Sequence, residues 1–193
     1  GVSSMASTSI RASQVVKYLK NVLGKTMVWG GTHATISPEK CIKDCDIVCV
    51  GEGEGALVEL CDKLSKGKDI SNVENFWVRK DGKIIKNGGR ALVEDLDKLP
   101  SPDFDIENHY ILDGKLRKFD ERDFNGMIFY QSERGCPHAC TYCINKRLRD
   151  INKGKGKILR THSVKYVIDD LVKLKNKFKT IKVFDIRDET FFI

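Results

Sequence analysis

The chain has 193 residues and a formal net charge of +7, with 40% hydrophobic and 32% charged residues. No apolar run approaches the roughly 20 residues that a membrane-spanning helix needs, so the sequence excludes a transmembrane helix. Apolar periodicity recurs from end to end, which also excludes a disordered chain. The length fits one large domain or two small ones.

The seven cysteines indicate the redox environment of the protein. Their odd number and uneven spacing differ from the disulfide framework of small secreted proteins. We therefore predict a cytoplasmic protein whose thiols serve packing or metal binding.

Positive charge is concentrated in residues 114–182, which hold 18 Lys and Arg against 7 Asp and Glu, whereas the remainder holds 16 against 20. A basic region of this kind could bind nucleic acid or small anions. Aromatic residues do not alternate with the lysines of residues 173–179, so we interpret the charge as a solvated surface. A nucleic-acid partner is not expected.

The first third of the chain alternates strand and helix patterns. The predicted elements are a strand end in residues 1–5, a helix from Ala12 to Gly24, a strand at 27–29, a helix with Ser37 as N-cap, a strand at 47–50 and a helix after residue 54. We expect the last helix to bury one face made of Leu57, Leu60, Cys61 and Leu64. Strands that alternate with helices at this spacing predict a parallel α/β sheet.

The middle of the chain has a different pattern. Asp81-Gly82 lies between two apolar segments and predicts a hairpin with a primed turn. The segment Leu99-Pro100-Ser101-Pro102-Asp103 disfavours helix and strand because of its two prolines. This segment predicts a domain boundary.

The last third returns to an α/β pattern. It predicts a strand at 127–130, a helix capped by Ser163 and a strand at 181–184. Residues 190–193 predict an apolar strand that the end of the chain interrupts. Because the chain also begins at Gly1 without an initiator Met, we expect it to be an internal piece of a longer protein.

The segment from Arg134 to Cys143 is the most specific chemical feature, because it places Cys136, Cys140 and Cys143 within eight residues. Thiolates select zinc, Cu(I) or iron–sulfur clusters. A structural zinc site needs four ligands, and only His138 lies nearby. Three cysteines that hold a four-iron cluster would leave one iron open to a substrate or cofactor. Zinc binding, and a loop with no metal, remain alternatives.

The spacing Cys136-x-x-x-Cys140-x-x-Cys143, with Tyr142 before the third cysteine and a strand in front, resembles the radical S-adenosylmethionine (SAM) enzymes. The resemblance implies a [4Fe–4S] cluster on these cysteines, with SAM at the fourth iron and Tyr142 in contact with SAM. It also implies cleavage of SAM to a 5′-deoxyadenosyl radical, with an electron donor such as flavodoxin or ferredoxin. Residues 185–191 resemble the acidic, Phe-containing segment of the cobalamin-associated branch.

Two glycine loops follow predicted strands, at Gly30-Gly31 and at Gly51-Glu52-Gly53. Alone they are weak signals, since paired glycines are more often turns. Together with residues 29–35, the Pro38-Glu39 helix start, the hairpin and the proline segment, they resemble the cobalamin-binding domain of radical SAM enzymes. The resemblance implies a cobalamin tail held by Ser3, Ser4, Gly30, Gly31, Thr32, Gly51, Glu52 and Gly53. His33 does not match the position of the lower axial ligand.

Four cysteines lie outside this motif: Cys41, Cys45, Cys49 and Cys61. Cys41 and Cys45 are four residues apart on a short helix, with Cys49 on the next strand. A second metal site is one reading. We prefer buried packing, as for small hydrophobic residues.

These observations predict an α/β fold, in which a partial flavodoxin/Rossmann-like parallel sheet precedes the first part of a radical SAM (β/α) partial TIM barrel. The expected domains are residues 1–70 as the C-terminal half of a cobalamin-binding domain, 71–123 as hairpin and linker, and 124–193 as the start of the radical SAM core. A lone first βα unit cannot close a barrel, so we expect this piece alone to be poorly stable and inactive.

The predicted function is that of a cobalamin-dependent radical SAM enzyme, with a small-molecule substrate and methyl transfer or cyclisation at an unactivated centre. One alternative is a radical SAM methylthiotransferase that acts on tRNA or protein. A second is a non-catalytic cobalamin-binding module with a structural metal site.

Overall fold

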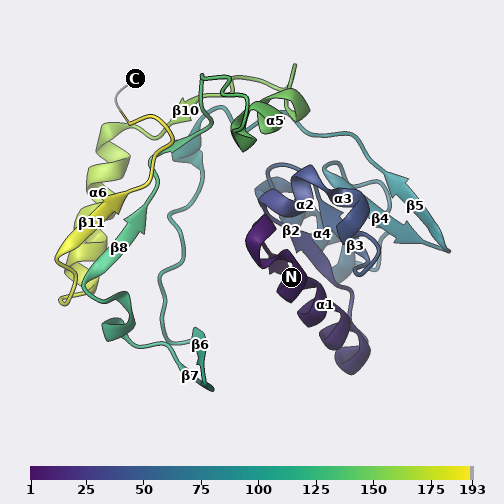
Figure 1. The fold of residues 1–193 in the computed structure, drawn as a ribbon, viewed down its shortest axis with the longest axis horizontal. Helices are drawn as coiled ribbons and strands as arrows, with labels where there is room; N and C mark the ends of the chain where they lie inside the picture. Colours follow the sequence, from purple (N-terminus) through teal and green to yellow (C-terminus); the bar gives the residue numbers. More distant parts are fainter. Residues whose placement is uncertain (192–193) are drawn as a thin grey trace. The chain divides into compact units, whose positions relative to one another are not determined.

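The computed structural model describes residues 1–191 and divides into two compact units (Figure 1). Unit 1 consists of residues 1–93 and 138–156, and unit 2 consists of residues 94–137 and the described residues from 157 onward. Within this described part of the chain, no helix is both long enough and apolar enough to cross a membrane.

Unit 1 is built on a five-stranded sheet with the order β1-β2-β3-β4-β5. Its strands are β1 (Val2–Ser3), β2 (Val28–Gly30), β3 (Ile47–Cys49), β4 (Phe76–Lys80) and β5 (Lys83–Lys86). The first three strands are parallel, whereas β4 and β5 are antiparallel to their neighbours. The predicted mixed α/β fold with a parallel-rich sheet is confirmed.

The first four helices of unit 1 follow its parallel strands, and a fifth comes later in the chain. They are α1 (Ser9–Leu23), preceded by the 3-10 turn η1 (Ala6–Thr8), then α2 (Thr32–Ile36), α3 (Pro38–Cys41), α4 (Glu54–Ser65) and α5 (Ile144–Ile151). Val48 packs in one cluster with Ala12 and Val16 of α1. Its neighbours Ile47 and Cys49 pack with α4 in the other cluster. Since successive strand residues point to opposite faces, β3 is buried on both faces, as predicted.

The buried face of α4 differs from the predicted one. Ala56 and Leu60 are buried, whereas Leu57 and Leu64 are 42% and 47% exposed, and Cys61 is also exposed. The face of α4 that contacts β3 and β4 is formed by Ala56 and Leu60, and the helix turns Leu57 and Leu64 away from this face. The prediction was right for Leu60 and wrong for the other three residues.

The hairpin of β4 and β5 turns at Asp81 and Gly82, whose φ angles are 49° and 73°. Positive φ at both central residues defines a type I′ turn, so the predicted primed turn is confirmed. The hairpin extends the sheet of unit 1, with Ile47 paired to Val78. The domain boundaries proposed from the sequence stay a prediction.

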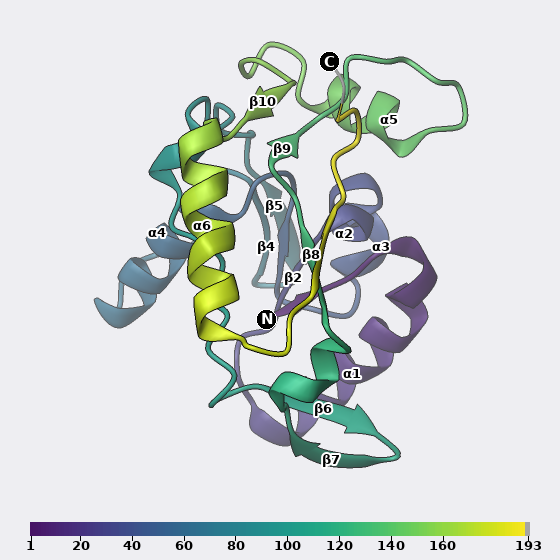
Figure 2. The same ribbon diagram turned by 90° about the vertical axis from the view of Figure 1, so that its left-hand side faces the viewer.

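Unit 2 contains a parallel βαβ arrangement. β8 (Met127–Tyr130) pairs in parallel with β11 (Val183–Ile186), and α6 (Val164–Lys177) lies alongside both strands (Figure 2). Its core is Ile128, Tyr130, Leu174, Phe178 and Ile181. Ser163 caps α6, since its hydroxyl accepts a hydrogen bond from the Tyr166 amide at 3.1 Å, as predicted.

Short elements connect this core. They are η2 (Leu96–Lys98), β6 (Tyr110–Asp113), β7 (Lys115–Lys118), η3 (Glu121–Phe124), β9 (Glu133–Arg134) and β10 (Arg160–Thr161). Residues 189–191 form a turn, so Thr190 and Phe191 are not in the predicted strand. The Thr190 amide instead donates to the Glu133 carboxylate of β9. The rest of that predicted strand, residues 192–193, lies outside the described residues.

Candidate functional site

The loops that follow β1, β2 and β3 meet at one edge of the sheet, because parallel strands place their carboxyl ends together. The Ser4 amide donates to the Gly30 carbonyl at 3.2 Å, and the His33 amide donates to the Ser4 carbonyl at 3.1 Å. The Gly51 amide donates to Thr35 Oγ1 at 3.1 Å. The structure therefore brings together the loops that carry the predicted cobalamin contacts.

Gly31 is required by the close approach of the first two loops. Its φ is +88°, and an added Cβ would lie 2.6 Å from Ser3 Oγ and 2.9 Å from both the amide nitrogen and the carbonyl oxygen of Ser4. Gly53 differs, since a Cβ there would meet Cys49 Sγ at 3.5 Å, which is an ordinary contact. The backbone geometry thus explains glycine at position 31 more strongly than at position 53.

The predicted polar contacts at this edge differ in accessibility. Ser3 and Thr32 are exposed. Ser4 is buried, and its hydroxyl accepts a hydrogen bond from Trp29 Nε1 at 2.9 Å. His33 Nδ1 is buried with no hydrogen-bond partner among the described residues. A polar group of a bound molecule at this edge would supply such a partner, so the residues present are compatible with a polar ligand.

Glu52 connects the third loop to the segment that leaves the sheet. Its carboxylate accepts a hydrogen bond from the Val93 amide at 2.9 Å, and its carbonyl accepts one from Asn75 Nδ2 at 2.7 Å. Asn75 Oδ1 in turn accepts from the Arg90 amide at 2.8 Å. These contacts position the residues before the linker, a role for Glu52 and Asn75 that sequence reasoning missed.

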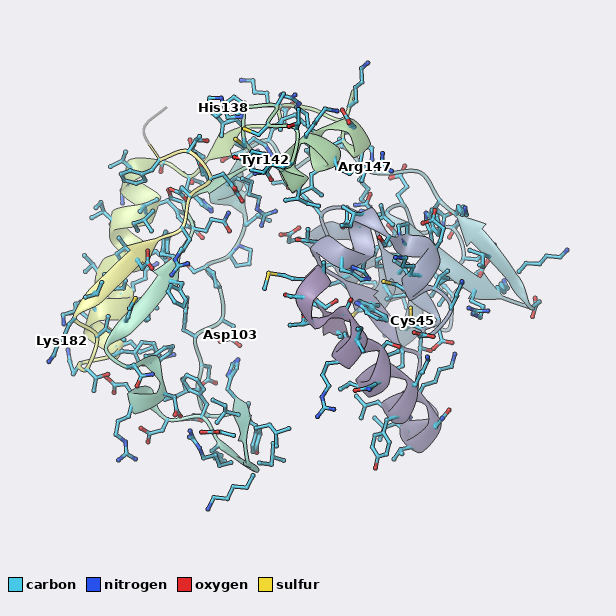
Figure 3. All side chains as sticks on the ribbon, viewed as in Figure 1. Cys45, Asp103, His138, Tyr142, Arg147 and Lys182 are labelled. Carbon is cyan, nitrogen blue, oxygen red and sulfur yellow. The ribbon has the colours of Figure 1, made fainter. Side chains whose placement is uncertain are left out.

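The cysteine loop lies between β9 and α5 and contains no helix or strand. Cys136 is buried in unit 2, where the Thr190 hydroxyl lies 3.9 Å from its sulfur. In unit 1, Cys140 is exposed and Cys143 is half-buried, and the Cys143 amide donates to the Cys140 carbonyl at 3.1 Å. Tyr142 is 91% exposed (Figure 3).

Across residues 1–191, no group of three His, Cys, Asp or Glu side chains is arranged to hold a metal ion. The donor chemistry nevertheless fits an iron–sulfur cluster, because three soft thiols lie on one irregular loop. The ligand assignment stays a prediction.

The acidic segment after β11 binds the loop after β8. The Asp188 carboxylate accepts hydrogen bonds from the Ser132 amide at 2.7 Å, the Glu133 amide at 3.2 Å and the Ser132 hydroxyl. The Glu133 carboxylate accepts one from the Thr190 amide at 2.8 Å. This segment thereby holds the start of the cysteine loop, a contact that only the pairing of β8 with β11 produces.

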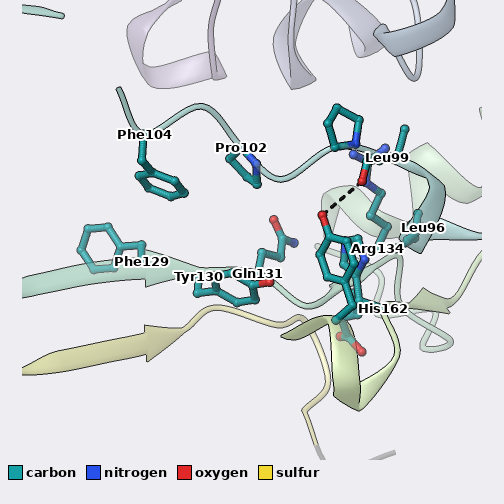
Figure 4. Close-up of a pocket in the computed structure, with 12 residues that line it drawn as sticks. Leu96, Leu99, Pro102, Phe104, Phe129, Tyr130, Gln131, Arg134 and His162 are labelled. Atoms are coloured by element: carbon teal, nitrogen blue, oxygen red, sulfur yellow. Dashed lines mark hydrogen bonds between the residues drawn. The ribbon is translucent and has the colours of Figure 1, made fainter. Parts of the chain in front are cut away.

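Unit 2 also contains a pocket of about 340 Å³ where the proline segment passes β8 (Figure 4). Its lining includes Leu99, Pro102, Phe104, Phe129, Tyr130 and His162. The Tyr166 hydroxyl donates to the Leu99 carbonyl at 3.1 Å, and the His162 ring stacks on Tyr166 with centroids 4.2 Å apart. Hydrogen bonds from Ser163 hold the pKa of Asp97, next to His162, below its usual range. The pocket was not predicted from the sequence.

Comparison with known proteins identifies relatives along most of the chain, although no family model matches it. An uncharacterised methyltransferase of Pyrococcus horikoshii is 31% identical over 197 residues, which cover 99% of this chain and 39% of the relative. The cobalamin-dependent radical SAM methyltransferase TokK of Streptomyces tokunonensis is 29% identical over 144 residues, which cover 69% of this chain and 20% of TokK. This chain is a homologue of the cobalamin-dependent radical SAM enzymes. It spans well under half the length of these relatives.

Solved structures of cobalamin-dependent radical SAM enzymes have the same fold as this chain. OxsB with aqua-cobalamin and SAM bound matches 97% of this chain and 25% of its own, with a TM-score of 0.70 and 19% identity. TsrM from Kitasatospora setae with cobalamin and a [4Fe–4S] cluster bound matches 94% of this chain and 34% of its own, with a TM-score of 0.66 and 16% identity. At these identities the likeness establishes the fold.

Proposed function

We propose that this chain is part of a cobalamin-dependent radical SAM enzyme that transfers a methyl group to, or cyclises, an unactivated centre of a small molecule. The observation that carries this proposal is the chain order of two distinct sites. Two glycine loops at the carboxyl edge of a parallel sheet precede a strand that leads into Cys136-x-x-x-Cys140-x-x-Cys143. Homology to TokK over 69% of the chain supports the same reading.

The loops of unit 1 would hold the cobalamin nucleotide tail. Ser3 and Thr32 are exposed at this edge, and Gly31 allows the first two loops to approach each other. Ser4 would act indirectly, because its hydroxyl is already bonded to Trp29. The loop after β3 would also contact the tail, through Gly51, Glu52 and Gly53. The Glu52 carboxylate in addition holds the start of the linker through the Val93 amide.

Cys136, Cys140 and Cys143 would hold the [4Fe–4S] cluster, and the exposed Tyr142 ring would contact SAM. When bound, the cluster would supply the electron that cleaves SAM, and cobalamin would carry the methyl group. The chain's own contribution is to place the cysteine loop through the bonds from Asp188 and Thr190. Such outer contacts orient the ligands of a metal centre.

Besides the small-molecule substrate, the proposal implies an electron donor and a cellular compartment. A radical reaction started by one electron needs an electron donor, for which a flavodoxin or ferredoxin is suited. The free thiols among the described residues are compatible with a reducing cytoplasm.

Anaerobic reconstitution with iron and sulfide tests the cluster. We expect about four irons and four sulfides per chain, the content of one [4Fe–4S] cluster. Cys140→Ala should abolish incorporation, whereas Cys61→Ala, at another exposed cysteine, should not. Retention of zinc in place of iron, or an unchanged iron content in Cys140→Ala, would overturn the assignment.

Titration with hydroxocobalamin under an absorbance spectrometer tests the other cofactor. The proposal expects stoichiometric binding with a shifted corrin spectrum, whereas a methylthiotransferase needs no corrin. Absence of bound corrin in the folded full-length protein would exclude the cobalamin-dependent function even if the cluster forms.

A further inference from the structure

Thr35 connects the two glycine loops of unit 1 through a single oxygen atom. It lies in α2, just after the Gly30-Gly31 loop, and is 5% exposed. Thr35 Oγ1 donates to the Gly31 carbonyl at 3.0 Å. The same atom accepts the hydrogen bond from the Gly51 amide at 3.1 Å.

A hydroxyl is suited to this position because it is both a donor and an acceptor. Its one proton is used in the bond to the Gly31 carbonyl, so its lone pairs remain for the Gly51 amide. Valine has the shape of threonine but neither function, and burial would leave the Gly51 amide unsatisfied. Serine would keep both bonds.

Neither loop is held by a side chain of its own at these glycines. Gly31 and Gly51 have φ angles of +88° and +96°. Glycine has no side chain that would restrict its backbone to one conformation. Their conformations therefore depend on the bonds that other residues make to them. The Thr35 hydroxyl makes one bond to each, and the Thr35 amide also donates to the Gly31 carbonyl at 3.0 Å.

The Thr35 bridge lies within a series of contacts along the sheet edge. On one side, the His33 amide binds the Ser4 carbonyl at 3.1 Å and so links the loops after β1 and β2. On the other side, the Val50 amide binds the Asn75 carbonyl at 2.8 Å. Thr35 connects the loop after β2 to the loop after β3, so that hydrogen bonds link the loops after all three parallel strands.

We propose that Thr35 is a positioning residue that sets the distance between the two glycine loops and so controls the affinity of this edge for cobalamin. The inference rests on the proposed function for its ligand. The loop bridge itself is a property of the protein without ligand, and it can be tested separately.

The experiment compares Thr35→Val and Thr35→Ser in the full-length protein, with Thr26→Val as the control. Thr26 is exposed in the segment before β2 and lies outside both loops. Amide hydrogen exchange at Gly51 is measured without ligand, and hydroxocobalamin affinity is measured by absorbance. Circular dichroism verifies that each variant is folded.

We expect Thr35→Val to raise the exchange rate at Gly51 and to weaken hydroxocobalamin binding, each about tenfold, because the Gly51 amide loses its bond to the hydroxyl and the Gly31 carbonyl keeps only the bond from the amide of residue 35. Thr35→Ser and Thr26→Val should resemble the parent protein in both measurements. Unchanged affinity in folded Thr35→Val would overturn the proposal.

If Thr35→Val does not fold, the Thr35→Ser variant tests the proposal. Because serine keeps the hydroxyl, a tenfold weaker hydroxocobalamin affinity in Thr35→Ser would contradict the proposed role of that hydroxyl. If the parent protein binds no corrin, the proposed function fails and the control of cobalamin affinity fails with it. Exchange at Gly51 then reports whether the bridge forms. Slow exchange in both Thr35→Val and the parent would refute the bridge as well.

Discussion

At the scale of single residues, the two loops after β1 and β2 are in contact through backbone atoms and leave no space at Gly31. Glycine is needed there for two separate reasons, the positive φ and the absence of a Cβ. Gly67 has only the first, since its φ is +60° and nothing lies within 4 Å of an added Cβ. The two positions therefore differ in the space around an added Cβ and in backbone conformation.

We predict that Gly31→Ala lowers the free energy of unfolding more than Gly67→Ala. Gly67→Ala forces a positive φ on alanine, at a cost of about 1 kcal/mol. Gly31 has φ +88° and ψ −177°, a conformation open essentially to glycine alone, and Gly31→Ala adds the clash with Ser3 and Ser4. Urea unfolding followed by tryptophan fluorescence measures the difference. Equal losses in the two variants would show that the loops separate easily and that the contact is unimportant.

The cysteines of unit 1 differ in their chemistry because they differ in burial. Burial raises the pKa of Cys41 and Cys49 to about 11 and that of Cys45 to about 12. Cys45 Sγ also lies 3.2 Å from the carbonyls of Cys41 and Ile47. These thiols are buried among core residues, as the preferred sequence interpretation expects.

Alkylation with iodoacetamide at about pH 8 should label Cys61 and Cys140 in the folded protein and spare Cys41, Cys45 and Cys49, because only thiolates react. Urea should make all of them reactive, as read by mass spectrometry. The same raised pKa values mean that these thiols support folding below their ordinary pKa near 9 and that this support falls as the pH rises through 11 to 12. Rapid labelling of Cys45 in the folded state would contradict this arrangement.

At the scale of elements, the parallel pair β8 and β11 brings an acidic turn to the start of the cysteine loop. Asp188 accepts two backbone amides and a hydroxyl from Ser132 and Glu133. The sequence singled out residues 185–191 by resemblance, but their contacts span 55 and 56 positions along the chain. Only strand pairing could reveal them.

We expect Asp188→Asn to lower the free energy of unfolding by about 1 to 3 kcal/mol, because the new amide group faces donors instead of accepting from them. Asp185→Asn is the control, since the Asp185 carboxylate pairs with the nearby Arg187 and not with the loop after β8. Thermal unfolding and iron retention after reconstitution are the measurements. Similar losses of stability and iron in both variants would remove the special role of Asp188.

Secondary structure was predictable wherever local chemistry decides it. The type I′ turn at Asp81-Gly82, the Ser163 cap and the strand at 127–130 all follow from residues adjacent in sequence. The buried face of α4 was not predictable in this way. Periodicity identified the helix, but contact with the sheet selected Ala56 in place of Leu57.

At the scale of the whole molecule, each unit has a core of its own. Unit 1 packs its sheet against α1 and α4, and unit 2 packs β8 and β11 against α6. We expect a defect in one core to remain within that unit, because each core cluster consists of residues of one unit.

Leu60→Ala should destabilise unit 1 by about 2 to 5 kcal/mol, because it leaves a cavity between α4 and the sheet. Leu57→Ala, on the exposed side of the same helix, should cost much less. Amide exchange should accelerate in β3 and β4 and remain unchanged in α6. Equal acceleration in α6 would show that the two units unfold as one.

The sequence by itself determined the fold class, most of the longer helices and strands, the cysteine motif and the family resemblance, because these depend on local periodicity and on spacing along the chain. Only the tertiary structure decided which residues meet across that order, such as Thr35 with Gly51, Glu52 with Val93 and Asp188 with Ser132. Each of these pairs joins segments that strand pairing brings together. A hydrogen bond between distant residues leaves no local pattern, and the positioning of the site is made of such bonds.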